Sequence, residues 1–236
     1  MKKLSNYIND ALNYSRSEHI NEWKLNDQSS NNVNKYTVTA NDEYDLQKII
    51  NRRINLNEKA PYLLDIDVSN VTTFKWLFSD CPVKEKITII DISSWNISDL
   101  LLFQGTFSEL VNLKTVIMPK INPKKLTSTL GMFYGCTSLT EVKNIENWTL
   151  ENVNNMGGMF NKCSNLISLD VSKWNVSKVK NLNSVFNECV NLTSLNGVED
   201  WNINSKADMP HMFYSCKETI IPSWYDKYWD TVDPLK

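Results

Sequence analysis

The chain has 236 residues, and 42% of them are hydrophobic, which is enough apolar material for a sizeable core. Its 25 lysines and arginines against 27 aspartates and glutamates leave a net charge of -2. The chain therefore lacks the basic excess that is typical of nucleic-acid-binding proteins, and it has no polybasic segment of the kind that holds proteins on anionic membranes. The N-terminus lacks the apolar stretch of a signal peptide, and the sequence contains no apolar run of about 18 residues that could span a membrane. We therefore expect a cytoplasmic or virion-associated protein.

Residues 1–64 are expected to form an N-terminal capping segment of mixed helix and strand. A helix is predicted over Lys2–Tyr14, followed by a polar loop at Asp27–Asn34 and a strand at Tyr36–Thr39. The apolar spacing of Asp42–Ile54 predicts an amphipathic helix whose first residue is the N-cap. A repeat array must cover its first open core face, and this segment is placed to do so. A separate function of the segment is the alternative.

Between residues 65 and 216 one pattern recurs: Trp–x11–Phe–x2–Cys–x2–Leu–x2–Leu. Its fullest copy reads Trp174, Phe186, Cys189, Leu192 and Leu195. From one Phe to the next, the steps along the array are 29, 26, 27, 26 and 27 residues. A fixed period in this range indicates a solenoid, in which no repeat can bury its apolar face without its neighbours.

Each repeat is predicted to contain a short helix and a short strand. Val179, Leu182, Phe186 and Cys189 follow the i, i+3, i+7, i+10 spacing of one helical stripe about three turns long. The spacing then changes to the LxxLxV pattern of a leucine-rich-repeat strand, as it does before Val171. The expected fold is an α/β repeat solenoid: a leucine-rich-repeat-like array of about six strand–turn–short helix repeats.

Large apolar side chains that recur at one place in successive repeats predict a ladder through the core. The ladder residues are Trp95, Trp148, Trp174, Trp201, Phe107, Phe133, Phe160, Phe186, Phe213, Cys136, Cys163, Cys189 and Cys216. A carbohydrate platform of stacked indoles is the alternative, but the Trp position accepts Ile66 and Ile121, which favours packing. The Cys position accepts Leu110 and the cysteines are odd in number, which favours core packing over disulfides or zinc.

The sequence offers no recognisable catalytic, cofactor-binding or metal-binding motif. There is no Walker loop, GxGxxG, GxSxG or HExxH, and the whole chain contains only 6 glycines. His19 and His211 are the only imidazole bases, and His211 lies where other repeats have Gly158 or Ser184. We therefore expect no enzymatic activity and no cofactor.

Residues 217–236 follow the last Phe–Cys pair and are expected to form a C-terminal cap. Four aromatic residues lie within Ile220–Trp229, close enough together to cover the last open face of the core. An exposed aromatic anchor for a partner is the alternative.

Two stretches of the array, DVSKWNVSKVKNLNSVFNECVNLTSL and DISSWNIS, resemble the repeats of the BspA-type leucine-rich repeat proteins. The resemblance covers residues 65 to 216 and is weakest around Ile121, between two prolines. Members of this family are bacterial surface proteins and lipoproteins, and similar repeats occur in phage-encoded proteins. The resemblance implies a non-enzymatic scaffold that binds other macromolecules. The family has no shared catalytic residues that could be transferred to this chain.

Two functional hypotheses follow. The first is a cytoplasmic interaction module, phage-encoded, that engages or inhibits a host protein. The second is a structural or adhesive protein of a virion or cell surface that binds protein or glycan. Neither hypothesis identifies the partner, and a protein partner is favoured over nucleic acid.

A binding surface is predicted on the concave face, at the strand positions that point away from the core. These positions are Thr115, Ile117, Glu141, Lys143, Ser168, Asp170, Ser194 and Asn196. They differ in every repeat while the core positions around them stay the same, as expected of a fixed framework with a variable surface. The alternative is that this face is only solvated, and that the aromatic tail or the N-terminal segment binds the partner.

Overall fold

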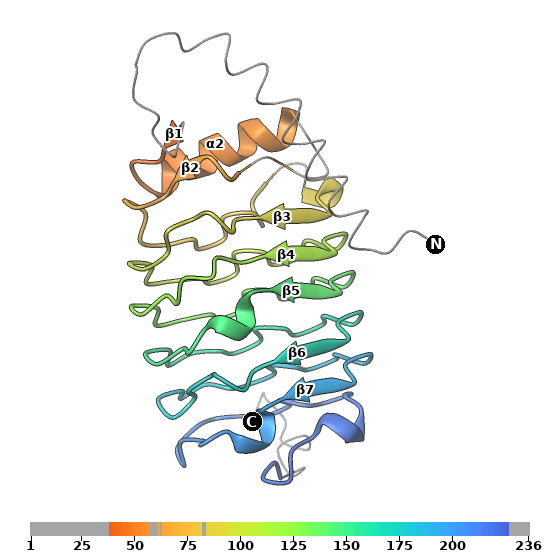
Figure 1. Ribbon diagram of the computed structural model, residues 1–236. Helices are drawn as coiled ribbons and strands as arrows, with labels where there is room; N and C mark the ends of the chain where they lie inside the picture. Colours follow the sequence, from red (N-terminus) through yellow and green to blue (C-terminus); the bar gives the residue numbers. More distant parts are fainter. Residues whose placement is uncertain (1–37, 57–60, 62, 82–83, 227–236) are drawn as a thin grey trace, which may run out of the picture.

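A computed structural model describes residues 38–56, 61, 63–81 and 84–226 (Figure 1). The helix predicted at Lys2–Tyr14 and the loop predicted at Asp27–Asn34 lie outside the described residues. Strand β1 (Val38–Thr39) pairs in parallel with β2 (Ile66–Asp67), and helix α2 (Glu43–Leu56) lies between them in sequence. The carboxylate of Asp42 accepts a hydrogen bond from the backbone N–H of Asp45 at 2.8 Å, so it caps α2 as predicted.

Five short parallel strands stack along one side of the solenoid (Figure 1). They are β3 (Ile89–Asp91), β4 (Thr115–Ile117), β5 (Glu141–Lys143), β6 (Ser168–Asp170) and β7 (Ser194–Asn196). Strands β3, β4 and β5 form one sheet, and β6 and β7 form another. Strands β4 to β7 lie where the LxxLxV pattern predicted them, and the central residue of every strand is an apolar side chain buried in the core.

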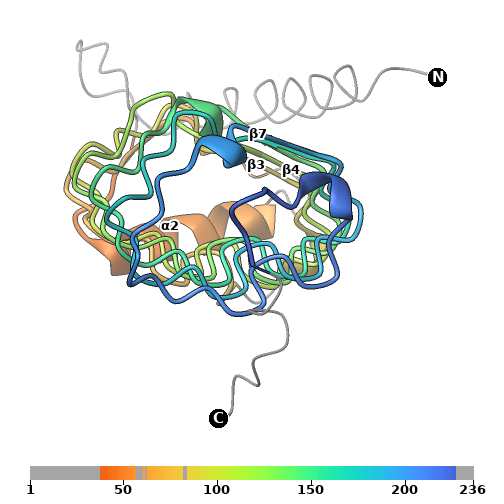
Figure 2. The same cartoon turned by 90° about the horizontal axis from the view of Figure 1, so that it is seen from below.

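The prediction of a short helix in every repeat is wrong. The segment that leads to the Phe of each repeat is instead irregular backbone. Isolated parallel bridges join this segment to the same segment of the neighbouring repeats and form a second ladder. These bridges link Thr73, Leu102, Ser128, Asn155, Asn181 and Asp208. Seen along the axis, the coils superpose as a flattened ring with the strands along one side, and α2 is the only α-helix in the described part (Figure 2).

Left-handed residues explain why no helix forms. The residue two before each Phe has positive φ in all six copies: Trp76, Gly105, Gly131, Gly158, Ser184 and His211. An α-helix needs right-handed dihedrals throughout and bonds from each N–H to the carbonyl four residues earlier. Here alternate N–H groups bond to the next repeat instead, as when Phe160 donates to the carbonyl of Val185 at 2.9 Å. Stacking of the repeats therefore replaces the hydrogen bonds of a helix.

The aromatic ladder fills the centre of the solenoid. Consecutive Phe rings from Phe78 to Phe213 stack with centroids 5.1 to 5.9 Å apart. Each ladder Trp is buried, and its indole N–H donates to a carbonyl of the preceding repeat, as from Trp148 to Pro119 at 3.1 Å. Buried indoles with a satisfied N–H are packing elements and present no sugar-binding surface.

The Cys position has a polar role that the sequence pattern did not reveal. The thiols of Cys136, Cys163, Cys189 and Cys216 each donate to the carbonyl of the Phe one repeat earlier, with sulfur–oxygen distances of 2.9 to 3.1 Å. All five cysteines are free, and all but Cys216 are buried. Burial raises the pKa of the Cys136 thiol from 9.0 to about 12, and burial likewise raises the pKa of Cys163 and Cys189.

Thiol labelling of the native protein is expected to be slow from pH 8 to about pH 10. A maleimide or disulfide reagent attacks the thiolate, and in an unfolded chain the thiols ionise near their ordinary pKa of 9.0. In the folded protein the raised pKa keeps Cys136 protonated across this window, so only unfolded molecules should gain reactivity as the pH rises. Cys216, which is partly exposed, should react first. Rapid labelling of three or more thiols in folded protein would contradict the buried ladder.

The C-terminal end of the array is covered by residues from the tail. A 3-10 turn, η4 (Glu218–Ile220), leads into Trp224 and Tyr225, whose rings lie 6.5 and 5.0 Å from that of Phe213. The indole of Trp224 donates to the carbonyl of Val198 at 3.0 Å, which repeats the hydrogen bond of the ladder tryptophans. These two aromatic residues therefore pack onto the core and are not an exposed anchor.

Candidate functional site

The outward positions of the strands become more accessible from β3 towards β7. On β3 both Ile89 and Asp91 are buried, whereas Ser194 and Asn196 on β7 are exposed. The predicted surface residues between them are graded: Ile117, Glu141, Lys143 and Asp170 are half-buried, and Ser168 is exposed. The accessible part of the predicted surface therefore lies over β5, β6 and β7.

Thr115 is an exception to the predicted surface, because it is buried. It lies in the middle strand of a three-stranded sheet, between Ile89 and Glu141 in register, and both of these side chains are larger than threonine. A small side chain between two long ones loses its contact with water. Its hydroxyl oxygen has no hydrogen-bond partner, so it cannot act as a surface contact as predicted.

The sheet is interrupted between β5 and β6. Elsewhere the residue after each strand donates to the neighbouring strand, as Met118 does to Lys143 at 3.0 Å and Val171 to Asn196 at 2.9 Å. The equivalent bond from Asn144 to Asp170 is absent among the described residues. Backbone polar groups are thus left without a strand partner at a sheet junction, where pairing is otherwise the rule.

One inserted residue accounts for this interruption. The repeat that contains β5 is 27 residues long, and the extra residue is Asn144, which adopts a left-handed conformation with φ 67°. It turns the chain into the 3-10 helix η2 (Ile145–Asn147), and its amide donates to the carbonyl of Met118 at 2.8 Å. Gly197 occupies the equivalent place after β7, again left-handed and again followed by a 3-10 helix, η3 (Val198–Asp200). The insertion after β5 is the one that lies between two strands.

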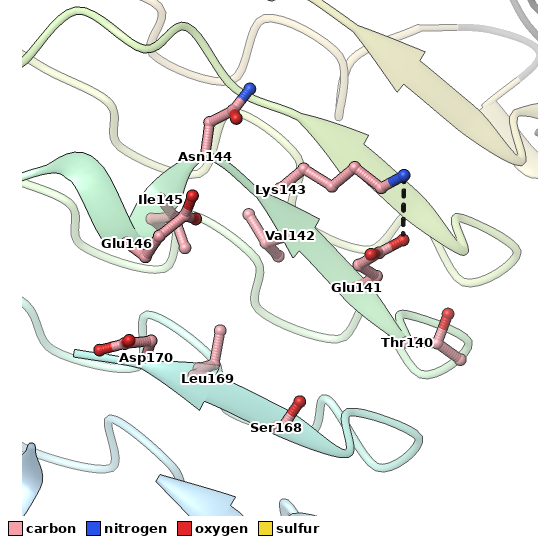
Figure 3. A pocket seen from close by; sticks show the side chains of 10 residues that line it. All are labelled: Thr140, Glu141, Val142, Lys143, Asn144, Ile145, Glu146, Ser168, Leu169 and Asp170. Carbon is pink, nitrogen blue, oxygen red and sulfur yellow. Dashed lines mark ion pairs between the residues drawn. The ribbon is translucent and has the colours of Figure 1, made fainter. Parts of the chain in front are cut away.

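A hollow of about 410 Å³ lies over the interruption (Figure 3). It is lined by residues 140–146 from β5 and its turn and by residues 168–170 of β6. Glu141 and Lys143 lie along β5, with the ammonium 3.7 Å from the carboxylate, and Asp170 lies across the hollow at the end of β6 (Figure 3). We call these ten residues the β5–β6 hollow.

The β5–β6 hollow carries negative charge. Its ionisable residues are Glu141, Glu146, Asp170 and Lys143, so three carboxylates face one ammonium. Hydrogen bonds from the hydroxyl and backbone N–H of Ser172 hold the pKa of Asp170 below its ordinary value, so this carboxylate is charged at neutral pH. The site therefore favours groups that are cationic or that donate hydrogen bonds.

The described residues contain no group of three or more His, Cys, Asp or Glu side chains that could hold a metal ion. In that same part of the chain, no helix has the length and apolar character needed to cross a membrane. His211 occupies a left-handed turn position, where its ring meets that of Tyr214 edge-on at 5.6 Å. Its Nε2 atom is buried and has no hydrogen-bond partner among the described residues.

Comparison with known proteins matches this chain to one family model and to solved structures of leucine-rich repeat proteins. The model of a family described as "Mycoplasma protein of unknown function, DUF285" matches residues 16–142 and 127–231. A leucine-rich repeat protein from Bacteroides ovatus is 24% identical over 69% of this chain and 36% of its own, with a TM-score of 0.43. A leucine-rich repeat protein from Eubacterium ventriosum is 17% identical over 72% of this chain and 50% of its own, with a TM-score of 0.35. This chain thus spans half or less of either protein, and the comparison with curated proteins found no match.

Proposed function

The chain belongs to the DUF285 family, whose repeats are related to the BspA-type leucine-rich repeats, and from this premise we propose that it is a non-enzymatic protein-binding scaffold. Six repeats between residues 65 and 216 form the framework, and segments at both ends close its core. The strand surface over β5, β6 and β7 carries the contacts with a partner protein. This proposal is supported by a buried core of recurring apolar positions beneath surface residues that vary along the array.

The β5–β6 hollow is the observation that carries the proposal. A solenoid sheet normally pairs every strand, and an interruption exposes peptide groups that a partner can use. The hollow also concentrates three carboxylates against one ammonium. A partner that inserts an arginine or lysine side chain would meet the charge of Asp170 and the free peptide groups together. We propose that the partner presents a cationic loop to this hollow.

Two cellular settings fit such a scaffold. In the first, the protein acts inside a cell and engages or inhibits a host protein, as a phage-encoded binder would. In the second, it is a structural or adhesive protein of a virion or cell surface. Fractionation separates them: the first requires the protein in the cytosol, and the second requires it on particles or at the surface.

The binding proposal is tested by affinity capture with four baits, the wild-type protein and three matched variants. Glu141→Arg and Asp170→Arg each reverse one charge of the β5–β6 hollow, and Glu151→Arg makes the same change in an exposed turn away from the strands. We expect a protein captured by the wild type and by Glu151→Arg to bind the other two baits at least about tenfold more weakly, as for reversed contacts across an interface. Mass spectrometry of the captured proteins measures this difference.

Equal capture by all four baits would remove the β5–β6 hollow from the binding surface. Circular dichroism and thermal unfolding of each bait serve as the folding control, because the altered side chains are not part of the core. A partner lost by Glu151→Arg as well would indicate that net charge, and not this site, governs capture.

A further inference from the structure

A second hollow, of about 420 Å³, lies on the side of the solenoid formed by the bridged segments, away from the strands. Three glycines line it, its polar lining is made of amides and hydroxyls, and Trp76 and Tyr134 contribute two aromatic rings. The lining residues are Trp76, Ser108, Leu130, Gly131, Tyr134, Gly157, Gly158, Asn161, Asn181, Asn183 and Ser184. We call this the glycine-floored groove.

None of these lining residues is ionisable at neutral pH, in contrast to the β5–β6 hollow. The ammonium of Lys162 lies 5.9 Å from the centre of the Tyr134 ring, and Lys162 is not among the lining residues. A site without charge gives no attraction to acidic or basic ligands, so the ligand class must be neutral.

The amides of the groove are arranged as donors. The backbone N–H of Asn183 donates to the side-chain oxygen Oδ1 of Asn181 at 2.9 Å. Because a backbone N–H can only donate, this bond identifies the oxygen of the Asn181 amide, and its NH2 group is the end that faces away. The side-chain oxygen of Asn183 accepts from the hydroxyl of Ser184 at 2.6 Å, and that of Asn161 accepts from the side-chain amide of Asn187 at 2.9 Å. No bond donated by the three NH2 groups occurs among the described residues. A fitting ligand therefore offers several uncharged acceptor oxygens.

Trp76 adds a flat apolar surface beside these donors. Among the described tryptophans, Trp76 alone combines a left-handed backbone, with φ 57°, and an exposed fraction of 40%. A bulky side chain is rare in this conformation, which places the indole over Gly105, where a Cβ atom would lie only 2.0 Å from the ring. The absence of a side chain at Gly105 thus makes room for the exposed indole.

We propose that the glycine-floored groove binds a neutral glycan. The apolar face of a sugar ring matches the exposed indole, and its hydroxyl oxygens match the free amide donors. Uncharged, hydroxyl-rich ligands are also compatible with a lining that has no ionisable group. This site is separate from the strand surface, so it stands or fails independently of the proposed protein partner.

Saturation-transfer NMR with the full chain tests the proposal. The probes are neutral oligosaccharides of glucose, galactose and N-acetylglucosamine, their uronic-acid counterparts, and an uncharged capped peptide rich in serine and asparagine. We expect at least one neutral oligosaccharide to bind, and the acidic counterparts and the peptide to bind at least about tenfold more weakly. Preference for the peptide, or no binding of any neutral oligosaccharide, would overturn the assignment.

Three variants locate the binding. Trp76→Ala removes the flat surface, and Asn181→Asp removes one donor while keeping the oxygen that accepts from Asn183. Both should weaken the oligosaccharide at least about tenfold. Tyr44→Ala, which removes an exposed ring from α2, should leave it unchanged. Unchanged binding by both groove variants would place the glycan elsewhere and overturn the proposal.

Discussion

Replacing Phe186 by alanine is expected to lower the free energy of unfolding by about 3–5 kcal/mol. The ring is fully buried and stacks between Phe160 and Phe213, with centroids 5.9 and 5.5 Å away, and it also contacts Trp201. Removing it leaves a cavity in the stack of rings that joins this repeat to both of its neighbours. Because each repeat is stabilised mainly by its neighbours, the array should lose cooperativity between its two halves. Denaturant unfolding followed by circular dichroism measures both effects.

Val190→Ala is the matched control for this substitution. Val190 lies four residues further on in the same repeat but is 43% exposed, so its truncation should cost less than about 1 kcal/mol. An unchanged denaturation midpoint for Phe186→Ala, with the control also unchanged, would show that the Phe ladder does not hold the repeats together.

Replacing Gly197 by alanine is expected to destabilise the protein by up to about 5 kcal/mol. Its φ of 84° disfavours any side chain, which costs about 1–2 kcal/mol, and a Cβ atom there would lie 2.2 Å from the Cα of Ser172 in the preceding repeat. Since that contact is with backbone, the two coils must separate, which adds about 1–3 kcal/mol. Thermal unfolding of the variant measures the sum.

Gly158→Ala separates the two contributions. Gly158 has a φ of 59°, but the nearest atom to a Cβ there is 3.7 Å away, and the equivalent positions hold Ser184 and His211. Only the backbone cost of about 1–2 kcal/mol should appear. Equal losses for the two alanine variants would mean that close approach of the coils at Gly197 contributes nothing.

The sequence was sufficient to predict the phase of the repeats, the strands and the composition of the core. Residues at the Trp, Phe and Cys positions recur at a constant spacing, and burial of a recurring apolar position is the direct consequence of stacking. The LxxLxV pattern located the strands from β4 to β7, because alternation of buried and outward residues has one structural interpretation over so short a segment.

The helix was predicted wrongly because apolar spacing alone does not distinguish a helix from an irregular coil around the same core. Both place residues such as Val179, Leu182 and Phe186 on one side. The signal that separates them was present: glycine two residues before Phe in three of the repeats, at a place that would be a helix interior. Glycine disfavours that setting and favours left-handed backbone, which the structure has there.

The candidate sites were predicted only in part. Four of the residues expected at the surface, Glu141, Lys143, Ser168 and Asp170, line the β5–β6 hollow. The interruption itself was not predicted, although the extra residue at Asn144 is visible as a 27-residue step. The glycine-floored groove was not predicted either, because Trp76, Gly131, Gly158 and Ser184 share the position two before Phe but carry different side chains there.

Hydrogen–deuterium exchange of the protein with and without its captured partner tests the central claim most directly. If the β5–β6 hollow is the binding surface, the partner should slow exchange in the peptides that span residues 140–146 and 166–170. Residues 149–160 of the same repeat, which lie away from the strands, should exchange at an unchanged rate and serve as the internal control. Protection confined to the N-terminal segment or to residues 217–236, with none at β5 and β6, would contradict the proposed binding surface.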